Sequence, residues 1–361
     1  MTKRIWIGSI SVLLLIGAIT AYSIRRWGEG DTPARSSLLA AMPADASTVV
    51  YADFAELRRS PFATELYKWA PQPPVDPEYA QFLRDTGFDY ERDLERVGVA
   101  IIKGAQDSTF FAVADGKFDN QKMNAYATQA GSRQNRGGRD IFSVPVSGST
   151  RYVSFTFLRK DRIALTDDST LNSFLAQPAS GEEAREWNAR FERLAGSPVF
   201  AVIRQDAAAG NLLATRAPGG MQSPQLSALL NQLQWISVAG KPEGDRLRII
   251  AEGECAADAT VRQLTDLLNG VLLLAQAGLH GPRTRLELEP KSREAYLEIL
   301  RGADVSRIDR GETKSVRLVF DVTAKFLDVA RTAGSVKPIA SPEPPSNTTT
   351  PARAKKKKSE K

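Results

Sequence analysis

The sequence contains one cysteine, Cys255, and one histidine, His280, in 361 residues. A lone cysteine cannot form an internal disulfide, and a structural zinc site needs about four cysteine or histidine ligands, so both are excluded. A Ser-His-Asp arrangement would depend on His280, which lies in GLHGPR, a segment that we expect to be a loop. The phosphate-binding pattern G-x-x-x-x-G-K-[ST] and the dinucleotide-binding pattern G-x-G-x-x-G are also missing. We therefore expect no catalytic residue, no cofactor and no metal.

The net charge of +6 is carried by the two ends of the chain. Residues 1–28 contain four basic residues and no acidic one. Residues 335–361 contain seven basic residues and two acidic ones, so the body between the two ends carries −3. A nucleic-acid-binding domain carries its basic surface on the folded part. We therefore expect that nucleic acid is not a partner.

A run of 20 uncharged residues, IWIGSISVLLLIGAITAYSI, extends from Ile5 to Ile24. A helix of that length spans about 30 Å, the thickness of a bilayer core. The alternative is a cleaved signal peptide, because Ala21–Ser23 offers small residues at the spacing of a cleavage site, although the apolar run is longer than such peptides have. We predict one membrane anchor within residues 1–28, with apolar and interfacial contacts from Trp6, Leu13, Leu14, Leu15, Ile16 and Tyr22.

The orientation of this anchor does not follow from its flanking charges, because basic residues lie on both sides of it. An N-terminal span before a large globular domain most often exports that domain, so we expect the body outside the cytosol. A second apolar run, Leu267–Leu279, has 13 residues and contains Asn269 and Gln276. It is too short to span a bilayer and predicts a buried core helix.

Two segments of the body, Val97–Phe118 and Ile236–Cys255, share one order of features: an apolar run, a short polar turn, a second apolar run and a glycine-containing exit. Each predicts a β-hairpin. A strand and a helix precede each hairpin, and a helix follows it. The order strand, helix, hairpin, helix therefore occurs twice, which predicts a duplicated α+β body whose mostly antiparallel sheet is covered by helices on one face.

Changes in composition predict the boundaries of these parts. Residues 29–37 are polar with Gly and Pro and indicate a linker. We expect the first α+β half at 38–180 and the second at 181–334. Residues 335–361 are rich in Pro, Ser, Thr and Lys with few apolar residues, which predicts a disordered basic tail.

Two pairs of acidic residues could carry carboxylate chemistry, and each pair has an ordinary structural interpretation. Asp167 and Asp168 are adjacent, but neighbouring acids before an apolar segment usually cap a helix. Glu252 and Glu254 alternate on a strand and could face one ligand together. Acids with that spacing usually form the solvent-exposed face of a strand.

The arginines at 133, 136 and 139 lie among glycines and could hold an anion, with a polar hairpin loop as the alternative. Cys255 follows a strand, and we expect it to pack as a small buried residue. A lysine run near the end of the chain could contact an anionic membrane or phosphate groups of surface polymers, with a solvated terminus as the alternative. Its members are Lys355, Lys356, Lys357 and Lys358.

The opening of the body, MPADASTVVYADFAELRRSP (Met42–Pro61), resembles the start of a family of uncharacterised, membrane-anchored exported proteins of bacteria. Proteins of that family begin with a Pro-Ala-Asp-Ala element, a strand and a short helix. The resemblance implies a bacterial source, export and anchoring. It supplies no activity and no catalytic residues.

Taken together, the anchor and the body predict a single-pass protein of the bacterial inner membrane with its body in the periplasm or outside. We expect a non-catalytic binding or scaffolding module for an envelope protein or polymer. One alternative is a carboxylate-based hydrolase that acts on envelope polymers. Another is a cytosol-facing protein whose basic tail binds anionic lipid.

Overall fold

The structure is a computed structural model that describes residues 32–69, 77–103, 108–146, 151–175, 178–204, 232–282, 289–311, 313–323 and 325–329. The predicted anchor residues from Trp6 to Tyr22 and the tail lysines from Lys355 to Lys358 lie outside this range. Among the described residues, no helix is both long enough and apolar enough to cross a bilayer.

The first elements in chain order alternate short helices with strands. They are α2 (Thr32–Leu39), β1 (Ala46–Asp53), α3 (Phe54–Leu57), α4 (Pro61–Trp69), α5 (Pro77–Thr86), α6 (Tyr90–Asp93), β2 (Leu94–Lys103), β3 (Ser108–Gly116), α7 (Asn120–Ala130), β4 (Ser132–Arg136), β5 (Arg139–Pro145), β6 (Tyr152–Arg159), β7 (Arg162–Thr166) and the 3-10 helix η1 (Asn172–Phe174). The later elements are α8 (Gly181–Arg193), β8 (Val199–Arg204), β9 (Leu233–Glu243), β10 (Arg246–Cys255), α11 (Asp258–His280), α13 (Pro290–Gly302), β11 (Asp304–Asp309) and β12 (Lys314–Thr323).

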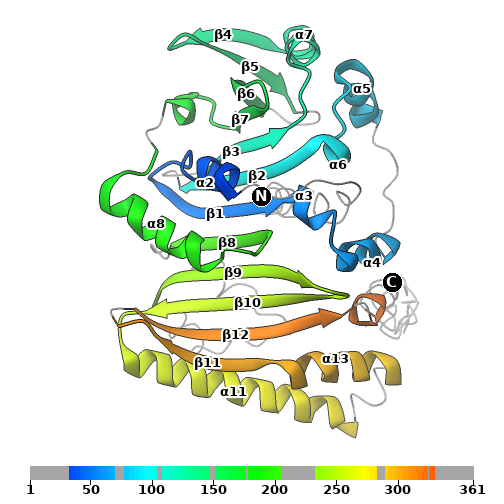
Figure 1. Cartoon of the computed structure of the whole chain (residues 1–361), viewed down its shortest axis with the longest axis vertical. Coiled ribbons are helices and arrows are strands. Elements are labelled where there is room, and N and C mark those ends of the chain that lie inside the picture. The colour runs from blue at the N-terminus through cyan, green and yellow to red at the C-terminus, as the bar shows by residue number, and fades with distance from the viewer. Residues whose placement is uncertain are drawn as a thin grey trace, which may run out of the picture.

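These strands form one twelve-stranded sheet in the order β11-β12-β10-β9-β8-β1-β2-β3-β7-β6-β5-β4. Figure 1 shows it as a continuous stack, with β4 at the top and β11 at the bottom. Every pairing in this order is antiparallel. The prediction of an α+β fold with an antiparallel sheet is therefore confirmed.

Both predicted hairpins are present. The first is formed by β2 and β3 and the second by β9 and β10. Each is preceded by a neighbouring antiparallel strand, β1 or β8, and each is followed by a helix, α7 or α11. The preceding strands pair with each other at the centre of the sheet, where Val50 lies opposite Ala201.

Helices cover both faces of the sheet, so the expectation of helices on one face is wrong. On one face, Leu38 of α2 and Trp187 of α8 pack in the same cluster as Val49 and Tyr51 of β1. On the other face, Ala52 of β1 packs with residues of α3 and α7. Helices can cover both faces because the central strands carry apolar residues on both sides. In β1, Val49 and Tyr51 point to the face with α2 and α8, and Ala52 points to the other face.

Residue patterns at the helix ends explain where these helices start and stop. The carboxylate of Asp53 accepts a hydrogen bond from Glu56 N at 2.8 Å, and Ser60 Oγ accepts one from Ala63 N at 3.2 Å. At the end of α7, a Cβ on Gly131 would lie 2.0 Å from the carbonyl oxygen of Ser143, so only glycine fits this close approach.

Within the segment predicted as a linker, the structure describes residues 32–37, which belong to α2, and the last residues of that helix, Leu38 and Leu39, are buried in the core. Two local expectations are wrong. His280 is the last residue of α11 and does not lie in a loop. The buried residues of α11 all lie in its first two turns, which pack on the sheet, whereas Leu273 and Leu274 in its second half are 66% and 74% exposed. The later turns of α11 meet α13, as in the hydrogen bond from Gln276 to the carbonyl oxygen of Leu300.

Candidate functional site

Glu252 and Glu254 lie side by side on β10 and face the same side of the sheet, as their spacing predicts. Their cross-strand partners on β9 are Ser237 and Trp235. The expectation of a solvent-exposed face is wrong, because the residues are only 8% and 3% exposed. Buried carboxylates need cations or hydrogen-bond donors as partners, and Glu252 and Glu254 each have such partners.

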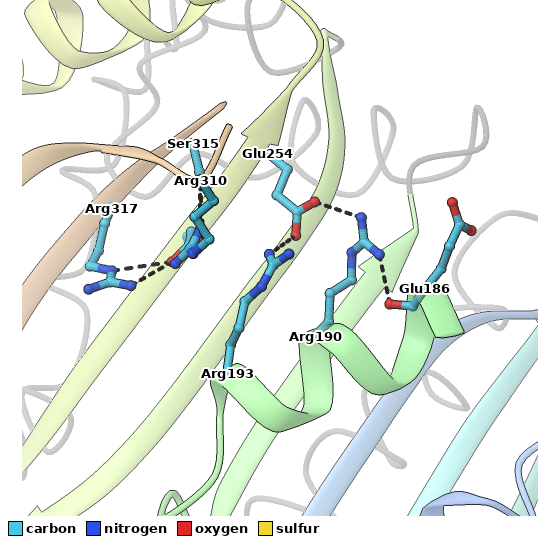
Figure 2. Close-up of polar contacts among 8 residues, drawn as sticks. Glu186, Arg190, Arg193, Glu254, Arg310, Ser315 and Arg317 are labelled. Carbon is cyan, nitrogen blue, oxygen red and sulfur yellow. Dashed lines mark hydrogen bonds and ion pairs between the residues drawn. The ribbon is translucent and has the colours of Figure 1, made fainter. Parts of the chain in front are cut away.

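Glu254 is held by two arginines of α8. Arg190 Nη2 donates to one carboxylate oxygen at 2.6 Å and Arg193 Nη1 donates to the other at 2.7 Å. Figure 2 shows both side chains reaching from α8 towards Glu254. The guanidinium of Arg190 also lies over the ring of Trp235, 3.8 Å from its centroid, which adds a cation–π contact. These contacts fasten α8 to the sheet.

Glu252 is held by residues of the C-terminal part of the sheet, on the side away from α8. Arg310, which follows β11, donates to both of its carboxylate oxygens, and Arg317 of β12 donates through Nε and Nη2 at 3.2 and 3.0 Å. The hydroxyl of Ser315 donates to it at 2.9 Å. We call Arg190, Arg193, Arg310 and Arg317, together with Glu252 and Glu254, the arginine cluster. Figure 2 shows the two pairs of arginines approaching from different elements.

The pKa of Glu252 lies below its ordinary value of 4.5, although burial on its own would raise it. Hydrogen bonds from Arg310, Arg317 and Ser315 to the carboxylate outweigh that effect of burial. The folded state therefore favours the ionised form more than the unfolded state does. The resulting stabilisation is fully present above the unfolded-state pKa and is lost as the pH falls through the lower folded-state pKa.

Replacing Glu252 with Gln is expected to lower the free energy of unfolding at pH 7 by about 1.5–3 kcal/mol, the range for hydrogen bonds to charged groups. The difference in free energy of unfolding between the variant and the wild type should stay constant above pH 4.5 and should decrease towards zero below it. Thermal unfolding of both proteins between pH 7 and about 3 measures this. Glu294→Gln, at a side chain that is 70% exposed, is the control and should show little difference at any pH. A difference for Glu252→Gln that stays constant down to pH 3 would contradict the assignment.

A second set of buried charges crosses the first part of the sheet. Asp53 of β1, Arg96 of β2, Asp115 of β3 and Arg162 of β7 stand directly opposite one another in register. Each is between 4% and 7% exposed. Arg96 donates to Asp53 at 3.0 Å, and Arg162 donates to Asp115 at 2.5 and 2.9 Å. We call these four residues the buried charge row; their signs alternate along the row and their charges sum to zero.

Asp167 and Asp168 act as structural acceptors. Asp167 accepts from the backbone N–H of Phe110 at 2.8 Å and pairs with Arg151. Asp168 accepts from the backbone N–H groups of Thr170 and Ser173 at 2.9 and 3.1 Å, just before η1. The pKa of Asp168 is lowered, because these hydrogen bonds outweigh the burial that would raise it. The prediction that this pair caps a helix is met only in part. Asp168 accepts from the N–H of Ser173 within η1, but the residue before η1 is Leu171, which makes no side-chain cap hydrogen bond, and Asp167 bonds to β3 instead.

The arginines at 133, 136 and 139 lie in the exposed hairpin of β4 and β5, as the loop interpretation predicts. Arg133 pairs with Asp140 at 2.7 Å, and Arg136 donates to the carbonyl oxygen of Thr170 at 2.7 Å. An open polar hollow of about 400 Å³ lies between α7 and this hairpin. The hairpin therefore supplies a polar edge to the sheet.

The two rare residues do not come together. Cys255 is 2% exposed at the end of β10, as expected for a packed small residue, and burial followed by the charge of Glu254 raises the pKa of its thiol to about 11. His280 lies at the end of α11. Among the described residues, no group of three or more His, Cys, Asp or Glu side chains is placed to hold a metal ion.

Two acids that sequence reasoning missed lie at the start of α6: Asp89 is its N-cap residue and Glu91 lies in its first turn. Asp89 accepts from the hydroxyl of Tyr79 at 3.2 Å and from the backbone N–H of Glu91 at 3.0 Å. Burial first, and then the charge of Asp89, raises the pKa of Glu91 to about 7. Nothing in the local sequence signals this shift, because it depends on the packing of the chain around Glu91.

No family model and no curated protein matches this chain. Three crystal forms of a protein called TP0453 have similar structures. Form III has a TM-score of 0.44 at 9% sequence identity, covering 81% of this chain and 97% of that one. Form IV has a TM-score of 0.42 at 10% identity, covering 83% and 96%, and form I has 0.42 at 9%, covering 85% and 99%. At these values the similarity supports no statement about function.

Proposed function

We propose that the chain is a non-catalytic, membrane-anchored binding or scaffolding module of the bacterial envelope. One observation carries this proposal: the acidic pairs that sequence reasoning singled out are engaged in structural bonds. Glu252 and Glu254 are held by four arginines, and Asp167 and Asp168 accept backbone N–H groups. A general acid needs a carboxyl whose protonated form is favoured, and arginine partners favour the ionised form.

The anchor within residues 1–28 and the resemblance of Met42–Pro61 to exported proteins support the placement in the inner membrane with the body outside the cytosol. We also propose that the body arose by duplication, with halves at 38–180 and 181–334. The supporting observation is the repeated order in the sheet: β1, β2 and β3 followed by α7, and β8, β9 and β10 followed by α11. The basic tail at 335–361 is expected to be disordered.

A carboxylate-based hydrolase is the second candidate, and Asp89 and Glu91 favour it more than the pairs above. A carboxyl with a pKa near 7 can donate a proton at neutral pH, and Glu91 has that property beside a second acid. The hydrolase predicts that Asp89→Asn and Glu91→Gln each abolish release of fragments from purified envelope polymers by the full chain. The binding module predicts no such release by the wild type.

The test of the proposed function is topology. A reporter that is active only outside the cytosol is fused after Gly334 and, separately, after Lys361, and mass spectrometry determines whether residues 1–28 are retained. Activity at both positions with the span retained is the expected result. A reporter that is active only in the cytosol, fused at the same positions, is the matched control. Activity of the cytosolic reporter instead would support the cytosol-facing alternative, in which the tail lysines lie beside anionic lipid.

A further inference from the structure

The arginine cluster has an excess of positive charge, which distinguishes it from the other buried network. Four guanidinium groups surround two carboxylates, whereas the buried charge row contains two arginines and two aspartates. Glu186 contributes its backbone carbonyl to Arg190, and its carboxylate points away from the cluster in Figure 2. Among these named groups, the cluster therefore carries two more positive charges than negative ones.

Three arginines of the cluster are partly exposed to solvent, so a ligand in solution can reach their positive charge. The side chains of Arg193, Arg310 and Arg317 are 26%, 25% and 34% exposed, whereas those of Arg96 and Arg162 are 9% and 6% exposed. Figure 2 shows the cluster between α8, which carries Arg190 and Arg193, and the part of the sheet that carries Arg317. A guanidinium has five N–H donors. The inner donors hold the glutamates, and the exposed edges present further donors to solvent.

The same contacts hold these guanidinium groups in place before any ligand arrives. Glu254 fixes Arg193 relative to β10, and Glu252 fixes Arg310 and Arg317 relative to the same strand. Planar, pre-positioned guanidinium groups bind phosphate oxygens through paired N–H donors and are more weakly hydrated than ammonium groups. Several of them on one face suit a doubly charged oxyanion better than a single carboxylate.

We propose that the arginine cluster binds a phosphate group, either as the free ion or as a unit of a linear phosphate polymer in the envelope. The proposal rests on the proposed function, because it names the chemistry that the binding module recognises. The exposed edges of Arg193 and Arg317 donate to the phosphate oxygens, while Arg190 and Arg310 keep the glutamates neutralised beneath. No covalent step is involved.

The test measures binding of inorganic phosphate and of short-chain polyphosphate to the full chain in neutral detergent by isothermal titration calorimetry. All proteins carry Gln at positions 355–358, which removes the tail lysines as a second site. The decisive variant is Arg193→Ala with Arg317→Ala, in which each glutamate keeps one arginine. Its melting temperature is recorded so that a folding defect is recognised. Arg193→Lys with Arg317→Lys keeps the charge and removes the planar fork.

The matched control is Arg159→Ala with Arg262→Ala, which removes two arginines that are 53% and 64% exposed elsewhere on the body. We expect the alanine pair at the cluster to weaken binding by at least about tenfold, the lysine pair to weaken it by less, and the control pair to change it by less than about twofold. A similar affinity per phosphate for both probes would indicate the free ion, and tighter binding of polyphosphate would indicate the polymer.

The proposal is overturned if the parent protein binds neither probe at millimolar concentration, or if the control pair weakens binding as much as the cluster pair. These outcomes are independent of the topology test. If the body is exported but binds no phosphate, the proposed envelope module is supported and phosphate is rejected as its ligand. If the body binds phosphate but lies in the cytosol, the phosphate site is supported and the placement in the envelope is rejected.

Discussion

Replacing Arg162 with Met is expected to lower the free energy of unfolding by about 3–5 kcal/mol, because it leaves a buried carboxylate without its cation. The side chains of Arg162 and Asp115 are each 6% exposed and share two hydrogen bonds, at 2.5 and 2.9 Å. Arg162 also donates to Ser37 Oγ at 2.9 Å, so its loss loosens α2 as well. Urea unfolding followed by circular dichroism, with the full chain in detergent, measures the change.

The double variant Arg162→Met with Asp115→Leu is expected to recover most of this loss, since replacing a buried ion pair by apolar side chains is often close to neutral. Arg159→Met is the matched control: its side chain is 53% exposed and pairs with Asp161, so the expected cost is below about 0.5 kcal/mol. A double variant as unstable as the single one would show that Asp115 is not the group destabilised by the loss of Arg162.

Replacing Phe200 with Ala is the second change with a large expected effect, a loss of about 3–5 kcal/mol. Phe200 is 1% exposed and lies on β8 at the centre of the sheet. Its ring stacks on Tyr51 with centroids 5.1 Å apart and contacts Phe191 of α8 at 5.8 Å. The substitution therefore opens a cavity among β1, β8 and α8, where elements from the two predicted halves meet.

Leu274→Ala is the comparison for Phe200→Ala, because Leu274 is 74% exposed and its truncation leaves no cavity. We expect less than about 0.5 kcal/mol for this control. A single unfolding transition that shifts as a whole for Phe200→Ala would indicate one cooperative core. Two transitions, of which only one shifts, would contradict the continuous core that joins β1, α8 and β8.

Local patterns in the sequence were sufficient to predict the two hairpins. The apolar runs on either side of a short polar turn identified β2 with β3 and β9 with β10. The starts of α3 and α4 also depend on local sequence alone, because the capping residues Asp53 and Ser60 bond to N–H groups only three residues further on. The exposed second half of α11 was missed, because apolar content does not reveal whether a helix has a partner along its whole length.

The charged networks could not be predicted, because their members are brought together by strand order and not by spacing. The buried charge row joins residues 53, 96, 115 and 162, each on a different strand, and its alternation of sign is visible only once β1, β2, β3 and β7 are known to be neighbours. Spacing did predict that Glu252 and Glu254 share a face. Their burial depends on arginines of α8 and β12 that lie about 60 positions away in the sequence.

The pairing of β1 with β8 has a consequence for how the chain is made. Val50 meets Ala201, which follows 151 positions later, so a growing chain carries β1 with β2 on one edge and an open edge on the other until β8 has emerged. An unpaired apolar edge is a template for wrong strand pairing, and contacts between distant positions form slowly. During synthesis, the protein is therefore expected to depend on chaperones that hold the centre of its sheet unpaired, and truncation before β8 should yield an aggregating product.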